Sequence, residues 1–359
     1  MSQHYEERME AERAEIDRKL RKVASIVEKQ MDNAVQAFLH HDMALANAVI
    51  LGDRQINRRI KELDYLCHAF IVRHAPSAGH LRFVSAVLRL DVALERVGDY
   101  ASTIGREVAH LNQRPPDTVL RDIELISTQA RRTFQQSLQA FHSRDVDLAR
   151  ETYGLADQTD FTLNAVLAAL LDAGERREVP LADAYALLRI VNLIKRVADQ
   201  SENVCEQTMF AVTGDTRDPK IFRILFVGDK NDRGTLMAEA YARKAFPESG
   251  RYRSAGWDPA QVMDSALSDF LDAKGIDVKG LRPSSLESAL REPLHFHVIV
   301  SLAPEGRARL LDAPFRSVIL DWQIEEGPGM DGEALERLYR EITVKVQELI
   351  TTLAGPDAR

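Results

Sequence analysis

One stretch of this chain reads Leu94-Glu95-Arg96-Val97-Gly98-Asp99, and a related stretch reads Ile194-Lys195-Arg196-Val197-Ala198-Asp199. The two copies are 100 residues apart, and each lies where apolar residues recur every three or four positions, as in an amphipathic helix. A repeat of this length predicts two similar helical units that arose by duplication. One difference reverses a charge, because Lys195 stands where the first copy has Glu95.

Helical patterns fill residues 1 to about 212 around the two copies. Breaks at His40-His41-Asp42, Pro76 and Pro115-Pro116 divide the pattern. We expect one helix through the apolar stripe that starts at Val23, followed by helices at about 43–75, 77–111, 118–143, 146–173 and 179–211. Two repeats of three helices, at about 1–114 and 115–212, place the repeated stretch on the last helix of each repeat.

The pattern changes after a polar stretch at 213–220, which predicts a linker. Short apolar runs then alternate with amphipathic segments: we expect strands at 222–227, 297–301 and 317–320, and helices at 235–246, 266–274 and 332–353. This alternation is typical of a doubly wound α/β domain with a parallel sheet, here at 221–359. The sequence therefore predicts a multidomain protein, with an all-α bundle followed by an α/β domain.

Composition excludes several classes of protein. The net charge of -8 disfavours nucleic acid as the main partner, because binding to a duplex usually depends on a concentrated basic surface. Two cysteines, Cys67 and Cys205, are too few for a disulfide framework. The N-terminus is too polar for a signal peptide, and no apolar run approaches the roughly 18 residues that span a bilayer. We therefore expect a soluble cytoplasmic protein.

Three acidic residues of the first copy are spaced by one helical turn. Asp91, Glu95 and Asp99 line up along one edge of the helix, beside the apolar stripe through Val87, Leu94, Ala101 and Ile104. Aligned carboxylates are the ligands that an oxygen-preferring cation requires. The alternative is a solvated surface on which Arg89, Arg96 and Arg106 neutralise the acids. Gly98, costly inside a helix, predicts close approach of another helix or a ligand.

The segment from Leu94 to Ala101 resembles the signature of the PhoU family, the phosphate-uptake regulators. Asp53-Arg-Gln-Ile56-Asn57, Cys67 and the segment 76–82 match as well, so that the resemblance covers nearly all of 1–212. It implies a regulator that damps phosphate uptake and phosphate-starvation signalling. The partners it implies are the ATPase subunit of a phosphate transporter and a membrane sensor histidine kinase. Such a protein is peripheral to membrane complexes and is expected to form a homodimer.

The same resemblance implies a divalent or iron-type metal ion on an acid-xxx-acid motif of each signature helix. Glu95 and Asp99 match the motif in the first unit, and Asp91 extends it by one turn. In the second unit only Asp199 matches, because Lys195 replaces the acid; its ammonium group would repel a cation and could pair with Asp199 in a weak surface contact. Nearby oxygen ligands there are Asn203 and Glu206. We expect a metal site on the first unit and a weakened or absent one on the second.

Residues 222–240 resemble the loop and helix of low-molecular-weight tyrosine phosphatases and arsenate reductases. Further matches are Ser254-Ala255-Gly256, Gly275-Ile276-Asp277 and Val298-Ile299-Val300, so that the resemblance covers roughly 221–355. In this family a cysteine begins the loop, an asparagine follows at +3, an arginine at +6 and a serine or threonine at +7. Backbone N–H groups of the loop and the next helix bind the oxyanion.

Alignment on Asn231 places Gly228 at the cysteine position, Gly234 at the arginine position and Thr235 at the hydroxyl position. No cysteine follows Cys205, and phosphocysteine chemistry requires a thiolate. The segment 321–328 is an uncertain match to the family's aspartate acid. The sequence therefore predicts a pseudo-phosphatase that is not an enzyme.

The degenerate loop has two possible roles. Lys230, Asn231, Arg233 and Thr235 could bind phosphate or a phosphoprotein, whereas Asp229 and Asp232 oppose an anion. The domain would then serve as an oxyanion sensor, or else as a docking module. The competing hypotheses are a phosphatase or arsenate reductase that uses non-standard residues, and a purely structural bundle without metal.

Overall fold

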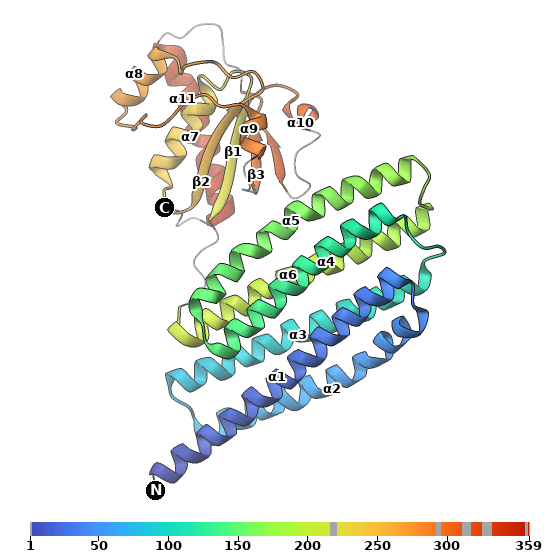
Figure 1. Cartoon of the computed structure of the whole chain (residues 1–359). Helices are drawn as coiled ribbons and strands as arrows, with labels where there is room; N and C mark the ends of the chain where they lie inside the picture. The colour runs from blue at the N-terminus through green and yellow to red at the C-terminus, as the bar shows by residue number, and fades with distance from the viewer. Residues whose placement is uncertain are drawn as a thin grey trace. The chain divides into compact units, whose positions relative to one another are not determined.

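The computed structural model describes residues 2–215, 221–291, 296–310, 317–324, 332–355 and 358. The chain divides into two compact units, Met1–Arg217 and Asp218–Arg359. Residues 2–215 form six helices (Figure 1): α1 (Ser2–His40), α2 (Met43–His74), α3 (Ala78–His110), α4 (Asp117–Ser143), α5 (Val146–Glu175) and α6 (Leu181–Thr213). All the expected helices are present, and residues 216–220 of the expected linker lie outside the described residues.

The turns between the first two helices of each repeat are built alike. His41 and Arg144 adopt left-handed backbone conformations, with φ of 49° and 57°. The following aspartates, Asp42 and Asp145, cap the next helix, because each side chain accepts a hydrogen bond from the N–H group three residues later. The predicted duplication is therefore visible in the local geometry as well as in the sequence.

The last helices of the two repeats, α3 and α6, run antiparallel in contact with each other. Arg89 Nη1 donates to Gln207 Oε1 at 3.2 Å, and Arg189 Nη1 pairs with Glu107 Oε1 at 2.6 Å. The two contacts join equivalent positions of the repeats: Arg89 corresponds to Arg189, and Gln207 corresponds to Glu107. Apolar residues of both helices, including Leu94 and Ile194, belong to one buried core. The helical unit is thus a single bundle with an internal pseudo-twofold relationship.

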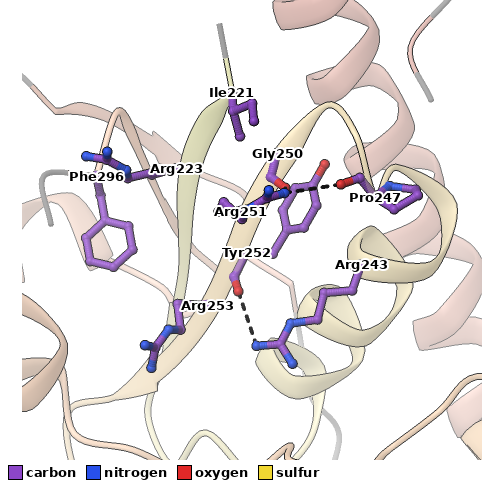
Figure 2. A pocket seen from close by; sticks show the side chains of 9 residues that line it. All are labelled: Ile221, Arg223, Arg243, Pro247, Gly250, Arg251, Tyr252, Arg253 and Phe296. Atoms are coloured by element: carbon purple, nitrogen blue, oxygen red, sulfur yellow. Dashed lines mark hydrogen bonds between the residues drawn. The ribbon is translucent and has the colours of Figure 1, made fainter. Parts of the chain in front are cut away.

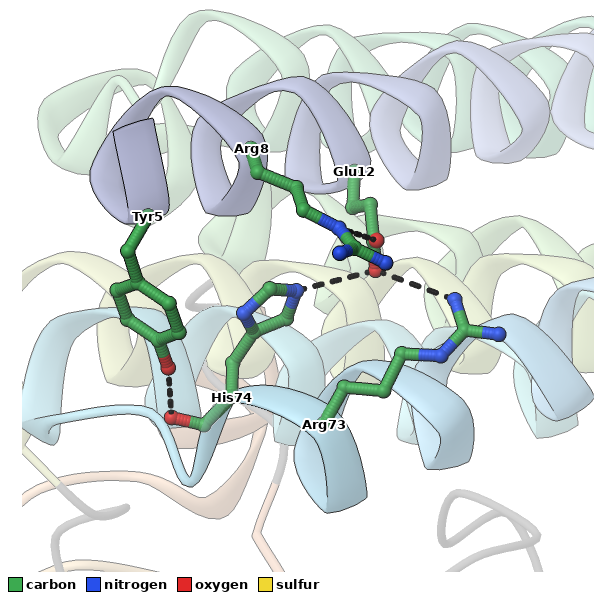
Figure 3. Close-up of polar contacts among 5 residues, drawn as sticks. All are labelled: Tyr5, Arg8, Glu12, Arg73 and His74. Carbon is green, nitrogen blue, oxygen red and sulfur yellow. Dashed lines mark hydrogen bonds and ion pairs between the residues drawn. The ribbon is translucent and has the colours of Figure 1, made fainter. Parts of the chain in front are cut away.

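Polar contacts join the beginning of α1 to the end of α2 (Figure 3). Glu12 Oε2 lies 3.1 Å from Nε2 of the buried His74 and 3.5 Å from Arg73 Nη1, and Glu12 Oε1 accepts from Arg8. Burial acts to raise the pKa of Glu12, but the hydrogen bonds from His74 and Arg8 hold that pKa below its ordinary value. The Tyr5 hydroxyl donates to the carbonyl of His74 at 2.6 Å. These contacts fix the first turns of α1 against α2.

The second unit is an α/β domain whose described residues form one parallel sheet. Its strands are β1 (Phe222–Gly228), β2 (Gly250–Gly256), β3 (Val298–Ser301) and β4 (Val318–Asp321), in the order β2-β1-β3-β4. The helices are α7 (Gly234–Ala245), α8 (Ser265–Ala273), α9 (Leu286–Arg291), α10 (Gly306–Arg309) and α11 (Gly332–Ala354). The sequence analysis did not predict β2, α9 or α10. The predicted fold class, an all-α bundle followed by a parallel α/β domain, is confirmed.

The two faces of the sheet are covered unequally. Ile224 and Phe226 of β1 pack in a large apolar cluster with residues of α7, α8 and α11. Leu225 and Val227 point to the other face, where a smaller cluster includes residues of the short helix α9. Successive side chains of a strand point to opposite faces, so that β1 is buried on both sides. This arrangement holds the loop after β1 at the carboxyl end of a buried strand.

Among the residues that the structure describes, no helix has the length and apolar character needed to span a membrane.

Candidate functional site

The predicted acidic row on α3 does not lie on one uniform surface. Asp91 is buried, with only 3% of its surface exposed, whereas Glu95 and Asp99 are exposed. Neither carboxylate oxygen of Asp91 has a hydrogen-bond partner among the described residues. Burial raises the pKa of Asp91 to about 8, and the charges of Asp64 and Glu95 act in the same direction. The structure therefore separates one predicted residue from the other two.

Two further carboxylates, Asp53 and Asp64, come from α2 and act on the acidic row of α3. The pKa of Asp99 is raised by burial and by the charges of Asp53 and Glu95, while Arg106 acts to lower it. Asp53 accepts a hydrogen bond from Asn57 Nδ2 at 3.1 Å, and its other oxygen has no partner among the described residues. The sequence analysis recorded Asp53 only as part of the family match and did not name Asp64. The acidic region thus spans two helices rather than one.

The arginines that could neutralise the acidic row do so only in part. Arg106 acts on Asp99, as noted, but Arg89 turns towards α6, where its guanidinium lies 5.3 Å from the centre of the Phe210 ring. Gly98 faces α2, because a Cβ atom added there would lie 3.4 Å from two carbons of Ile56. The packing is closer at Gly105, where a Cβ would lie 3.0 Å from the carbonyl oxygen of Ala46. The close approach of another helix that was predicted from Gly98 is present, and the helix is α2. The two helices are closest at Gly105, two turns after Gly98.

The carboxylates on α2 and α3 are of the ligand type that a hard cation prefers, but they are not arranged around a common point. Carboxylate oxygens are the preferred ligands of Mg²⁺, Ca²⁺ and related ions. In the described part of the chain, however, no three His, Cys, Asp or Glu side chains are placed where they could hold a metal ion. Glu95 and Asp99 are exposed, and Asp53 of α2 lies close enough to Asp99 to raise its pKa. A cation would therefore gather its ligands from α2 and α3 rather than find them preset.

The corresponding place on α6 is occupied by an ion pair. Lys195 Nζ donates to Asp199 Oδ1 one turn later. The expected pairing is confirmed, but the expectation of a surface contact is wrong, because only 4% of Lys195 is exposed. Asn203 donates to Gln200 Oε1 at 3.0 Å. The two repeats thus differ at this position as predicted, with a cation held by the protein itself in the second.

The loop after β1 is pinned by its own backbone. Its carbonyl groups at Gly228, Asp229 and Lys230 accept hydrogen bonds from the N–H groups of residues 257, 258 and 260, at 2.8–3.1 Å. Gly256 permits this approach, because a Cβ there would lie 2.9 Å from the carbonyl oxygen of Asp229. The loop therefore has one defined path that ends at the first turn of α7.

Asn231 occupies the centre of this loop. Its backbone is left-handed, with φ of 48°, and its side chain is buried. Its Oδ1 accepts a hydrogen bond from Thr235 Oγ1 at 2.8 Å, whereas its Nδ2 has no partner among the described residues. Of the other predicted anion-binding residues, Lys230 is exposed and Arg233 Nε lies 3.8 Å from Asp264 Oδ2. The loop therefore keeps a buried N–H donor at its centre.

The cysteine position of the loop is filled by another side chain. A Cβ atom added to Gly228 would lie 2.8 Å from Cγ2 of Thr235, closer than real side chains approach. A thiol at Gly228 would therefore require Thr235 to move. Of the segment matched to the acid, Asp321 ends β4 and is exposed, and residues 325–328 lie outside the described residues.

One residue near the loop was missed by the sequence analysis. Arg309 of α10 pairs with Asp229, with Nη1 2.6 Å from Oδ1. Its guanidinium also lies over the Trp257 ring, 3.8 Å from the ring centre. This pair neutralises one of the two acids that were expected to oppose an anion. No local signal marks Arg309, because the partners are 80 residues apart in the sequence.

Comparison with known proteins follows the division into units. The PhoU domain model matches the chain twice, at residues 20–108 and 123–208. The phosphate-specific transport system accessory protein PhoU homolog of Pseudomonas aeruginosa is 27% identical over 223 residues, which cover 60% of this chain and 89% of that protein. The crystal structure of PhoU from Pseudomonas aeruginosa has a TM-score of 0.55 at 26% identity, over 57% of this chain and 99% of that one.

The α/β unit has structural relatives of a different kind. A low-molecular-weight protein tyrosine phosphatase from T. tengcongensis aligns over 37% of this chain and 99% of that one, with 23% identity and a TM-score of 0.33.

Proposed function

The PhoU domain model matches residues 20–108 and 123–208, and from this premise we propose that the protein regulates phosphate homeostasis rather than catalysing a reaction. It would lower phosphate transport and phosphate-starvation signalling when phosphate is abundant. The proposal is supported by the relative named as an accessory protein of phosphate-specific transport, which this chain matches over most of that protein's length. The observation that carries it is the duplicated bundle, with its acidic region on α2 and α3.

The partners would be those of a transport accessory protein. We place the ATPase subunit of a phosphate transporter and a sensor histidine kinase first, both reached from the cytoplasmic side, with the chain acting as a homodimer. Asp53, Glu95 and Asp99 would hold a divalent or iron-type cation, which would supply positive charge between two helices that otherwise repel at this surface. Lys195 supplies such a charge permanently in the second repeat.

The α/β unit would bind without catalysing. The methyl group of Thr235 fills the nucleophile position at Gly228, and the two thiols of the chain lie in the helical unit. Burial raises the pKa of both thiols, that of Cys205 to about 12, so that neither is a thiolate near neutral pH. Phosphatase or reductase chemistry would have to use other residues.

A role for the loop as an oxyanion sensor is supported by one polar group. Asn231 Nδ2 is buried without a partner among the described residues, at the start of a helix whose N–H groups favour anions. A phosphate oxygen is an acceptor that would satisfy it. Calorimetric titration of the full chain with phosphate, arsenate and sulfate tests this role, and Asn231→Ala should abolish any heat. Absence of binding at millimolar anion would leave only a docking role.

The regulatory function is tested in cells that lack this gene. Uptake of radiolabelled phosphate should rise in the deletion strain and return to normal when the wild-type gene is restored. The Glu95→Ala/Asp99→Ala variant should restore it poorly, and elemental analysis of the purified variant should show less metal than the wild type. Uptake that is unchanged by the deletion would refute the proposed function. Equal metal content in the two proteins would refute the metal site alone.

A further inference from the structure

A pocket of about 720 Å³ opens beside the edge strand β2, near the amino-terminal ends of β1 and β2. The loop after Gly228 lies at the opposite, carboxyl end of the same strands. Figure 2 shows that the lining side chains come from both strands, from α7 and from the segments next to them. Four of the nine lining residues are arginines, and none of those nine is acidic: Ile221, Arg223, Arg243, Pro247, Gly250, Arg251, Tyr252, Arg253 and Phe296.

Strand register places three of the arginines on one face of the sheet. Arg223 of β1 is directly opposite Arg251 of β2, and Arg253 follows two residues later on the same strand. Adjacent strands are about 4.8 Å apart and two residues advance a strand by about 6.6 Å, so that the three side chains start from the corners of a small triangle. Like charges directly opposite each other destabilise a sheet. Their presence at paired positions indicates a role other than holding the strands together.

The remaining contacts orient two of the guanidinium groups. Arg251 Nη1 donates to the carbonyl oxygens of Pro247 and Gly250, at 3.3 Å each. Arg243 Nη2 donates to the carbonyl oxygen of Tyr252 at 3.4 Å, and it also pairs with the buried Glu239 (Figure 2 shows the contacts to Pro247 and Tyr252). A guanidinium has five N–H donors, so these anchors leave donors for a ligand while they fix the planes of the groups. Glu239 pairs with Arg243 and also interacts electrostatically with Arg253, so that it offsets part of the positive charge of the pocket.

We propose that this pocket binds the linked phosphoryl groups of an oligophosphate. Guanidinium groups bind phosphate oxygens in a two-pronged geometry, and each pair is a charge-assisted hydrogen bond. The arginines are spread over two strands and a helix, which suits several linked phosphoryl groups better than a single phosphate ion. Inorganic tripolyphosphate and the triphosphate chain of ATP share this chemistry. The site is separate from the loop at Asn231 and does not depend on the proposed function.

The proposal is tested by calorimetric titration of the full chain with tripolyphosphate, ATP and orthophosphate. Tripolyphosphate should bind at least about tenfold more tightly than orthophosphate, because it engages several guanidinium groups at once. The Arg251→Gln/Arg253→Gln variant should bind tripolyphosphate at least about tenfold more weakly. Both side chains are exposed, so the fold should persist. The matched control is Arg337→Gln/Arg340→Gln, which removes two charges from the exposed side of α11 and should bind like the wild type.

The two sources of the ligand are separated by the same titrations. Tighter binding of tripolyphosphate than of ATP assigns the site to inorganic oligophosphate, and the reverse order, lost in the same variant, assigns it to a nucleotide. A separate Arg223→Gln variant should also weaken binding and guards against an unfolded double variant. Unchanged affinity in both strand variants, equal affinity for orthophosphate and tripolyphosphate, or loss of binding in Lys230→Gln/Arg233→Gln instead would overturn the proposal.

Discussion

Lys195 donates a hydrogen bond to Asp199 from inside the helical bundle, whereas the first repeat has an exposed Glu95 at the equivalent position facing Asp99. The duplicated helices therefore carry opposite electrostatics on the same framework. In the first repeat, burial and then the charges of neighbouring carboxylates raise the pKa of Asp91 and that of Asp99. In the second, an ammonium group compensates the carboxylate within the chain. This difference can be measured without any metal.

We expect the Lys195–Asp199 pair to stabilise the bundle. Asp199→Asn should lower the free energy of unfolding by about 1–3 kcal/mol, because the buried ammonium loses a charged partner. A double-mutant cycle with Lys195→Met should give a coupling of about 0.5–3 kcal/mol. Urea denaturation followed by far-UV circular dichroism measures both. The control is Asp147→Asn, whose partner Arg150 is on the surface of α5, and its effect should stay below about 1 kcal/mol. Additive effects in the cycle would contradict the pairing.

Asp91 should make the stability of the bundle depend on pH. Its pKa is raised to about 8 by burial first, so that the folded state holds a proton which the unfolded state releases near pH 4. The stabilising effect of that proton is complete below about pH 4 and is lost as pH rises to about 8, with a slope of up to about 1.4 kcal/mol per pH unit. Asp91→Asn should remove this slope and stabilise the protein most at the alkaline end. Urea denaturation from pH 5 to pH 8.5 measures it, with Asp122→Asn of α4 as the control. The prediction fails if the wild type and Asp91→Asn show parallel pH profiles.

Two glycines of α3 should respond in opposite ways to alanine. At Gly98 an added methyl group would contact Ile56 at 3.4 Å, which is an ordinary packing distance. Gly98→Ala should therefore change stability little or raise it by up to about 1 kcal/mol, because alanine favours the helix. At Gly105 the methyl group would meet the carbonyl oxygen of Ala46 at 3.0 Å, and that backbone cannot easily retreat. Gly105→Ala should cost about 1–3 kcal/mol. Thermal denaturation of the two variants decides the matter, and a loss at Gly98 with none at Gly105 would refute the packing described.

A cysteine restored to the loop should strain it. Gly228→Cys should destabilise the α/β unit by about 1–3 kcal/mol, because its Cβ would overlap Cγ2 of Thr235. Adding Thr235→Ser should recover most of this loss, since serine lacks that methyl group but keeps the hydroxyl that donates to Asn231. Thr235→Ser alone is the control. Both tryptophans, Trp257 and Trp322, lie in this unit, so that their fluorescence during guanidinium denaturation reports it selectively.

The same variants test the assignment of the loop as inactive. Gly228→Cys and Gly228→Cys/Thr235→Ser should not hydrolyse an aryl phosphate, because glycine remains at the arginine position, Gly234, and that residue has no guanidinium to stabilise the transferring phosphoryl group. Turnover by the wild-type chain would contradict the assignment outright.

The helical framework could be predicted because its signals are local. Pro115-Pro116 and the capping Asp42 mark helix boundaries wherever they occur, and the repeat at a separation of 100 residues specifies two units. Strand β2 was missed because its exposed residues are arginines: with Arg251 and Arg253 alternating with a glycine and a tyrosine, it lacks an apolar run. The segment forms a strand because it pairs with β1, and this pairing cannot be read from the residues of β2 alone.

Burial at the candidate sites could not be predicted for a similar reason. Asp91 and Glu95 occupy the same edge of one helix, and tertiary packing encloses the first but not the second. Lys195 was expected at the surface because lysine is rarely enclosed. Arg309 reaches the loop across 80 residues of sequence, a contact that depends on the folded sheet. Residue type and spacing identify candidates, and tertiary contacts decide their charge state.

The reciprocal contacts between α3 and α6 bear on how the bundle can come apart. Arg89 with Gln207 and Arg189 with Glu107 join equivalent positions of the two helices, by a hydrogen bond in the first case and by an ion pair in the second. Each repeat therefore serves as the other's binding partner, as the two subunits of a symmetric dimer do. Cutting the connection near Pro115 would leave two fragments, each with an uncovered apolar seam that only its counterpart matches. The bundle therefore resembles a dimer whose two subunits are joined covalently. Because the halves are parts of one chain, the sequence of one repeat can change while the other keeps its original residues.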